Sequence, residues 1–171
     1  MSFLRPNDRS IQVIPHTKKT VQHRSSSEKQ PCGERNDVQY RAYADTDTLS
    51  IFFKKVAPGL ISHTEDIAPG ILADYSDAGQ LVSLDLNLAS MHTPCHFFDT
   101  TDVVNGKQPL ALSWDFNSDS DQLTVFLTNE QRTGHAEQTE DPHISMGTDD
   151  GGLWQAIIIQ NASGICSVRG K

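Results

Sequence analysis

The sequence repeats itself, and this feature constrains the fold more than any other. The segment DTDTLSIFF at residues 45–53 returns as DSDQLTVFL at residues 119–127. The offset between equivalent residues changes only from 74 to 72 to 73 along the chain, as loop-length changes would produce. A repeat of this kind predicts two similar structural units. Further equivalent pairs are His63 and His135, Glu65 and Glu137, Pro69 and Pro142, Ile71 and Ile144, Asp77 and Asp150, Gly79 and Gly152, and Ser90 and Ser163.

Hydrophobic residues alternate with polar ones in both copies, which is the pattern of a half-buried β-strand. Leu49, Ile51 and Phe53 fall on one face of a predicted strand, with Thr48 and Ser50 on the other. Residues 70–75 and 80–88 predict a hairpin around the turn at 76–79, whose counterpart is the turn at 149–152. In such turns Asp caps backbone N–H groups and Gly adopts positive φ.

These patterns predict an all-β fold of two tandem antiparallel β-meanders, each of three or four strands. One such unit is too thin to bury a face alone, so we expect the copies to pack as a pseudo-twofold sandwich or half-barrel. The expected boundaries are 38–91 for copy one, 92–112 for the connection and 113–165 for copy two. Together they form one duplicated domain at residues 38–171.

Residues 1–37 have the composition of a disordered leader, with three prolines, a Ser run and interspersed charges. This segment holds seven Lys or Arg against four Asp or Glu, and the remainder holds seven against eighteen. An acidic body of net charge −11 therefore follows a leader of net charge +3. Two alternatives for the leader are a docked strand at residues 11–14 and a transit peptide.

The composition also narrows the function classes. An acidic body lacks the clustered Lys and Arg that nucleic acids require, so no nucleic-acid partner is expected. No apolar run has the length of a membrane span or signal-peptide core, and the three cysteines show no paired spacing, so we expect a cytoplasmic protein without membrane association. Phosphate loops, nucleophile elbows and dinucleotide fingerprints are missing, so no cofactor is expected.

An aromatic residue, a short turn and Asp-x-Leu-x-Ile/Val open each copy; a Glu-containing segment, Asp-x-x-Gly, an apolar strand and Ala-Ser follow. In this order of features the chain resembles the small domains of domain-of-unknown-function family 2283. The resemblance covers residues 40–90 and, more weakly, 114–163. It implies a compact β-rich domain, present here as two divergent tandem copies, and carries no established reaction.

The copies differ in their acidic residues. Copy one has Asp74 before the hairpin turn and Asp85 in the last strand, where copy two has Gly147 and Ile158. We expect copy one to carry the solvent-facing or site-bearing surface, copy two to serve as packing scaffold, and Ile158 to be covered. Counting residues through the hairpin places Asp74 and Asp85 about four residues apart, too far to act as one carboxylate pair.

His63 with Glu65, and His135 with Glu137, each place an imidazole and a carboxylate on one side of an extended segment. Such a couple can transfer protons near neutral pH. If the copies face each other, the two pairs can line one cleft; the alternative is a polar strand surface in water.

Other groups have mainly structural interpretations. Asp45 with Asp47 and Asp119 with Asp121 can bind a hard cation, but turn capping is the default role of such residues. His92, Cys95 and His96 suggest a metal site or a Cys nucleophile, against a plain connecting loop. Aromatic side chains can line an apolar ligand pocket or belong to the core; they are Tyr40, Tyr43, Tyr75, Phe98, Trp114 and Trp154.

Two functions follow as hypotheses. The first is a small cofactor-independent isomerase, cyclase or dehydratase acting on a small, apolar organic molecule in a cleft between the repeats. Its catalytic residues would be His63, Glu65, His135 and Glu137, with Asp74 and Asp85. The alternative is a non-catalytic binding or oligomerising β module, such as a homodimer formed through exposed strand edges.

Overall fold

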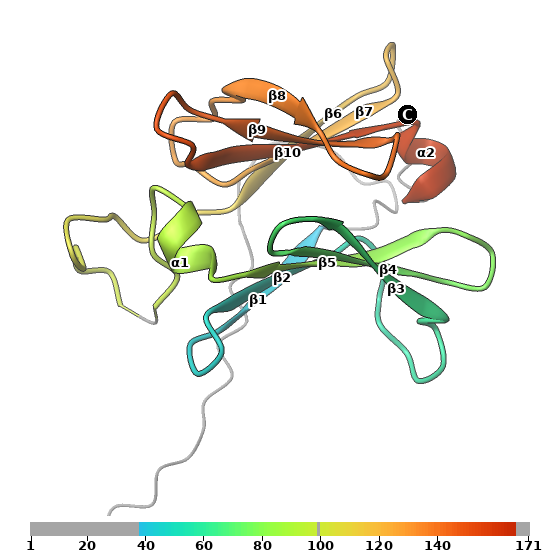
Figure 1. Cartoon of the computed structure of the whole chain (residues 1–171), viewed down its shortest axis with the longest axis horizontal. Helices are drawn as coiled ribbons and strands as arrows, with labels where there is room; N and C mark the ends of the chain where they lie inside the picture. Colours follow the sequence, from blue (N-terminus) through green and yellow to red (C-terminus); the bar gives the residue numbers. More distant parts are fainter. Residues whose placement is uncertain (1–37, 99, 167–171) are drawn as a thin grey trace, which may run out of the picture.

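The computed structural model describes residues 38–98 and 100–166 and contains two five-stranded antiparallel sheets (Figure 1). The leader predicted at residues 1–37 lies outside the described residues. The first sheet contains β1 (Gln39–Tyr43), β2 (Thr48–Phe52), β3 (His63–Ala68), β4 (Ile71–Tyr75) and β5 (Leu81–Asn87). The second contains β6 (Ser113–Asn117), β7 (Gln122–Phe126), β8 (His135–Gln138), β9 (Ile144–Thr148) and β10 (Trp154–Gln160).

The strand order is β1-β2-β5-β4-β3 in the first sheet and β6-β7-β10-β9-β8 in the second. The all-β fold with two antiparallel sheets is thus confirmed, although each sheet has more strands than the three or four expected. The order also differs from a simple meander. After β2 the chain crosses to the far edge as β3, and it returns through β4 so that β5 pairs with β2. Residues distant in sequence therefore become neighbours on β2 and β5.

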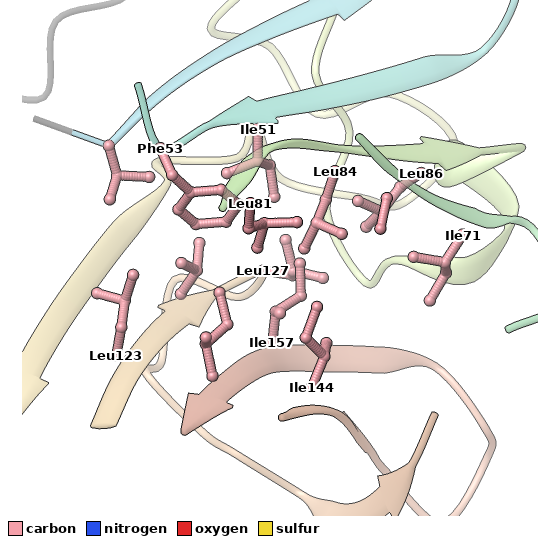
Figure 2. Close-up of a cluster of buried hydrophobic side chains, with 14 of the residues drawn as sticks. Ile51, Phe53, Ile71, Leu81, Leu84, Leu86, Leu123, Leu127, Ile144 and Ile157 are labelled. Atoms are coloured by element: carbon pink, nitrogen blue, oxygen red, sulfur yellow. The ribbon is translucent and has the colours of Figure 1, made fainter. Parts of the chain in front are cut away.

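One hydrophobic core fills the space between the two sheets (Figure 2). The alternating residues Leu49, Ile51, Leu84 and Leu86 of the first sheet face this core and are fully buried. The second sheet contributes Leu123, Val125, Leu127, Ile157 and Ile159 in the same way. Because both inner faces contribute to a single core, neither sheet buries its apolar face without the other.

A single helical turn follows the last strand of each sheet, α1 (Ala89–His92) and α2 (Ala162–Ile165). The carboxylate of Asp47 accepts hydrogen bonds from the backbone N–H and hydroxyl of Ser90, and Asp121 does the same for Ser163. These bonds satisfy N–H groups that a helix start leaves free. Asp47 and Asp121 thus have a structural capping role, although they cap a turn some forty residues away rather than their own.

The two sheets are also joined by polar contacts beside β3. The backbone N–H of Glu140 donates to the carbonyl of Ile67 at 2.8 Å, and the hydroxyl of Tyr75 donates to Asp141. Burial and the bond to Asp141 raise the pKa of Tyr75 well above its ordinary value. The phenol therefore stays protonated at neutral pH and serves as a cross-sheet hydrogen-bond donor.

Within the described part of the chain, neither helical segment has the length or apolar character to cross a membrane.

Candidate functional site

A hollow of about 340 Å³ lies on the outer face of the first sheet, away from the core. Strand alternation explains its position, because every second side chain of β2, β4 and β5 points away from the core. The lining residues are Tyr43, Thr46, Thr48, Ser50, Phe52, Ile61, Asp74, Ser83 and Asp85.

The strand register brings the polar residues of the hollow together. Ser50 lies opposite Asp85 across β2 and β5, and Ser83 lies opposite Asp74 across β5 and β4. Asp74 in turn lies opposite Thr64 on the edge strand β3. Thr64, Asp74 and Ser83 therefore form one polar row that ends at Phe52, and Ser50 and Asp85 lie side by side in the next row.

Both acidic side chains of the hollow accept hydrogen bonds from hydroxyl groups. Asp74 is only 9% exposed; its Oδ1 accepts from Thr64 at 2.6 Å and its Oδ2 from Ser83 at 2.7 Å. Asp85 accepts from the Ser50 hydroxyl through Oδ1. No ion pair joins either carboxylate to a Lys or Arg within residues 38–98 and 100–166. The protein thus holds both carboxylates with neutral donors.

The expected separation of Asp74 and Asp85 is wrong. Asp85 lies opposite Leu72, two residues along β4 from Asp74 rather than four, and both side chains line the same hollow. Two local features cause the difference. Ser76 bonds to Gln80 across a three-residue turn, and a bulge leaves Val82 without an opposing residue. Each shifts the register by one residue and brings the two acids closer.

His63 and Glu65 lie on the other face of the first sheet. They are opposite Tyr75 and Ala73, which belong to the core, whereas their neighbour Thr64 faces the hollow. The imidazole Nε2 is 3.4 Å from Glu65 Oε1, and its ring stacks on Tyr75. Their side chains are 50% and 57% exposed because β3 is an edge strand. The four predicted residues of copy one are thus split between the two faces of one sheet.

His135 and Glu137 do not form the predicted couple. The Nε2 of His135 lies 3.1 Å from Asp150 Oδ1, in the turn after β9, and Glu137 accepts a hydrogen bond from Thr148. The side chains of His135 and Asp150 are 80% and 97% exposed. The two histidines begin the edge strands of different sheets, and neither lines the hollow. The structure therefore does not bring the two pairs into one cleft.

The equivalent face of the second sheet is closed by its own backbone. Small residues, Ala136, Gly147 and Ala156, stand where the first sheet has Thr64, Asp74 and Ser83. The carbonyl oxygen of Thr133 lies 1.7 Å from the position that a Cβ on residue 147 would occupy. Gly134, which follows Thr133 in the chain, has a φ of +63°. This left-handed backbone conformation favours glycine and directs the chain onto the sheet.

The expectation that Ile158 would be covered is only partly correct. Ile158 lies on the outer face between Thr124 of β7 and Ser145 of β9 and is only partly buried.

The His92, Cys95 and His96 group does not converge on a metal site. His96 is buried, with Nε2 bonded to the carbonyl of Asp102 and Nδ1 accepting from the N–H of Phe98. His92 stacks on Trp154 at 4.5 Å, and burial raises the pKa of the Cys95 thiol, which disfavours a nucleophilic thiolate. No group of three His, Cys, Asp or Glu suited to a metal ion occurs among the described residues.

The predicted aromatic group is dispersed as well. Trp154 and Tyr75 are core residues, Trp114 and Tyr40 pack at its edge, and Tyr43 lines the hollow. An apolar pocket built from all of them is not formed.

Of the lining residues, the sequence indicated Asp74, Asp85 and, as a possible pocket aromatic, Tyr43, but not Thr46, Thr48, Ser50, Phe52, Ile61 or Ser83. A signal was available, because Thr48 and Ser50 share one face of β2, and Ser83 and Asp85 share one face of β5. What was missing was the pairing of β2 with β5, since these strands are separated by β3 and β4 in sequence.

Comparison with known proteins adds one finding. Residues 43–90 match the model of a family described as protein of unknown function (DUF2283). The match covers less than a third of the chain, and it contains all the residues that line the hollow. No curated protein and no solved structure matches the chain.

Proposed function

We propose that this protein is a non-catalytic binding module whose ligand, a small organic molecule, occupies the hollow on the first sheet. The observation that carries the proposal is the hollow itself, which places hydrogen-bonding groups beside the rings of Tyr43 and Phe52. Its volume of about 340 Å³ is at the lower end of the roughly 300–1,000 Å³ typical of ligand pockets. The ligand is accordingly small.

The second sheet supports this proposal by contrast. We propose that it is a divergent second copy of the same domain, since it repeats the strand order and the capping bonds of Asp47 and Asp121. In this copy the Thr133 carbonyl fills the place that Asp74 occupies in the first. On this view duplication left one copy with an open face and made the other a scaffold.

A bulky side chain on the hollow provides a test. Thr48→Trp is expected to weaken binding of small aromatic fragments at least about tenfold, because the indole would fill a shallow site. Fragment binding is measured through NMR shifts of Tyr43, Phe52 and Ile61. Gln122→Trp is the matched control, since Gln122 holds the same register place on the second sheet. Equal effects of both variants, or no fragment shifts in the hollow of the wild-type protein, would contradict the proposal.

An acid–base enzyme is the second candidate, and the contact between His63 and Glu65 favours it. The carboxylate orients an imidazole that is exposed to solvent and can exchange protons with a small molecule. The reaction class would be that of a cofactor-independent isomerase, cyclase or dehydratase.

For this candidate, His63→Ala is expected to lower any such activity by about 100-fold or more. A turnover screen of small organic substrates measures the effect. His143→Ala is the control, because His143 is exposed and its imidazole forms no ion pair with a carboxylate among the described residues. Activity that survives His63→Ala would eliminate this candidate.

We further propose a cytoplasmic location. Cys95 and Cys166 are both buried free thiols, as suits a reducing compartment.

A further inference from the structure

The two carboxylates of the hollow form no ion pair with any residue that the structure describes. Asp74 and Asp85 are separated by one diagonal step of the sheet and line the same surface. Their hydrogen-bond donors are the neutral hydroxyls of Ser50, Thr64 and Ser83. Hydroxyl donors orient a carboxylate without cancelling its charge. Two like charges held this close repel each other, and a cation placed between them relieves that repulsion.

Asp85 also has an oxygen available to a ligand. Its Oδ1 accepts from Ser50, whereas its Oδ2 has no hydrogen bond to the residues at 38–98 and 100–166. The side chain is only partly buried, so that its free oxygen can be reached from the hollow. A carboxylate oxygen in this position accepts a hydrogen bond from a charged donor more strongly than from a neutral one.

A cationic side chain on this face, Arg41, packs on Phe52 at the border of the hollow rather than pairing with the acids. Arg41 lies opposite Ser50 across β1 and β2, on the same face as the hollow. Its guanidinium carbon stands 5.9 Å from the centre of the Phe52 ring and forms no ion pair with either acid. Arg41 therefore does not serve as the internal counterion of Asp74 or Asp85.

Besides Thr46 and Thr48, the rest of the lining is apolar or aromatic. Tyr43, Phe52 and Ile61 border the carboxylates, and Tyr43 and Ile61 are among the exposed large hydrophobic residues. These side chains can cover a short hydrocarbon or aromatic body, whose burial contributes in proportion to the area removed from water.

From this arrangement we propose that the ligand is a small primary amine, in which an ammonium group is joined to a short apolar or aromatic body. The ammonium donates hydrogen bonds to Asp85 Oδ2 and to Asp74, and the body lies against Tyr43, Phe52 and Ile61. This inference rests on the binding function proposed above and specifies the ligand class of the same site. The acidic surface of the whole domain attracts such a cation at long range.

Three probes of similar shape test the charge requirement: phenethylamine, the neutral 2-phenylethanol and the anionic 3-phenylpropionate. Binding to the full chain is followed by NMR shifts of the hollow residues. Phenethylamine is expected to bind about tenfold or more tightly than the alcohol, with the acid the weakest, since a charge-assisted hydrogen bond is the main difference between them.

Asp85→Asn isolates the residue responsible. The amide keeps an acceptor for Ser50 and removes the charge, so phenethylamine affinity is expected to fall about tenfold while 2-phenylethanol affinity stays constant. The unchanged alcohol affinity also reports an intact fold. Asp115→Asn is the matched control. Asp115 lies on the outer face of the second sheet, at the register position that Arg41 holds in the first sheet. It removes the same charge outside the hollow and is expected to leave both affinities unchanged.

The possible results separate the ligand class from the function. If the alcohol or the acid binds as tightly as the amine, or if Asp115→Asn weakens amine binding as much as Asp85→Asn, the amine assignment is wrong and the binding function stands. If none of the three probes shifts the hollow residues of the wild-type protein, both the ligand class and the proposed function are overturned.

Discussion

Gly147→Ala is expected to destabilise the protein by roughly 3 kcal/mol, because the added methyl group has no space. Its Cβ would stand 1.7 Å from the carbonyl oxygen of Thr133, and a backbone oxygen cannot move aside as a flexible side chain can. Either the loop before β8 must leave the sheet or β9 must shift within it. Urea unfolding followed by far-UV circular dichroism measures the change.

Gly151→Ala is the control for this substitution. The nearest atom to its added Cβ is a side-chain oxygen of Asp149 at 3.2 Å, and the backbone at Gly151 is not in the left-handed region. Its effect is expected to stay within about 1 kcal/mol. If Gly147→Ala were as stable as Gly151→Ala, the Thr133 carbonyl would not pack against Gly147. The proposed difference between the open outer face of the first sheet and the closed outer face of the second would then be wrong.

Leu84→Ala is expected to cost about 2–5 kcal/mol, since Leu84 is fully buried in the central strand of the first sheet. Because one core joins both sheets, the loss should appear as a lower midpoint of a single transition. Both tryptophans of the chain, Trp114 and Trp154, belong to the second sheet, so their fluorescence reports on the sheet that was not altered. Tryptophan fluorescence and circular dichroism should therefore shift together.

The control is Val103→Ala, in the connection between the sheets, where the side chain is 54% exposed. Its effect is expected to be no larger than about 0.5 kcal/mol. If Leu84→Ala left the tryptophan transition unchanged while circular dichroism showed a separate, earlier one, the two sheets would be independent folding units, contrary to the shared core.

The local elements follow well from the sequence. Alternation at residues 49–53 and 123–127 predicted β2 and β7, and Asp and Gly at residues 76–79 and 149–152 predicted the turns that join β4 to β5 and β9 to β10. Those signals are local, because side-chain alternation and positive φ depend on adjacent residues. The first strand of each sheet was less evident, since β1 and β6 are edge strands with only half-buried inner residues.

The site follows from the sequence only in part. The sequence singled out Asp74 and Asp85 as acids that have no acidic equivalent in the second repeat, and the contact of His63 with Glu65 agrees with the two-residue period of a strand. In the second copy the same spacing gave no such contact, because the nearby turn offers Asp150 to His135. The two-residue period of a strand places two side chains on one face of the sheet, but it does not determine which nearby residue each side chain contacts.

By itself the sequence determined that this chain forms two similar β units, because a repeat with strand periodicity admits little else. Only the tertiary structure decided which residues meet. The pairing of β2 with β5 joined Ser50 to Asp85, and a bulge at Val82 brought Asp74 beside them. The loop at Thr133 and Gly134 closed the matching face of the second sheet. Strand order, bulges and loop paths depend on contacts between distant residues, and these are the contacts that a local sequence pattern does not encode.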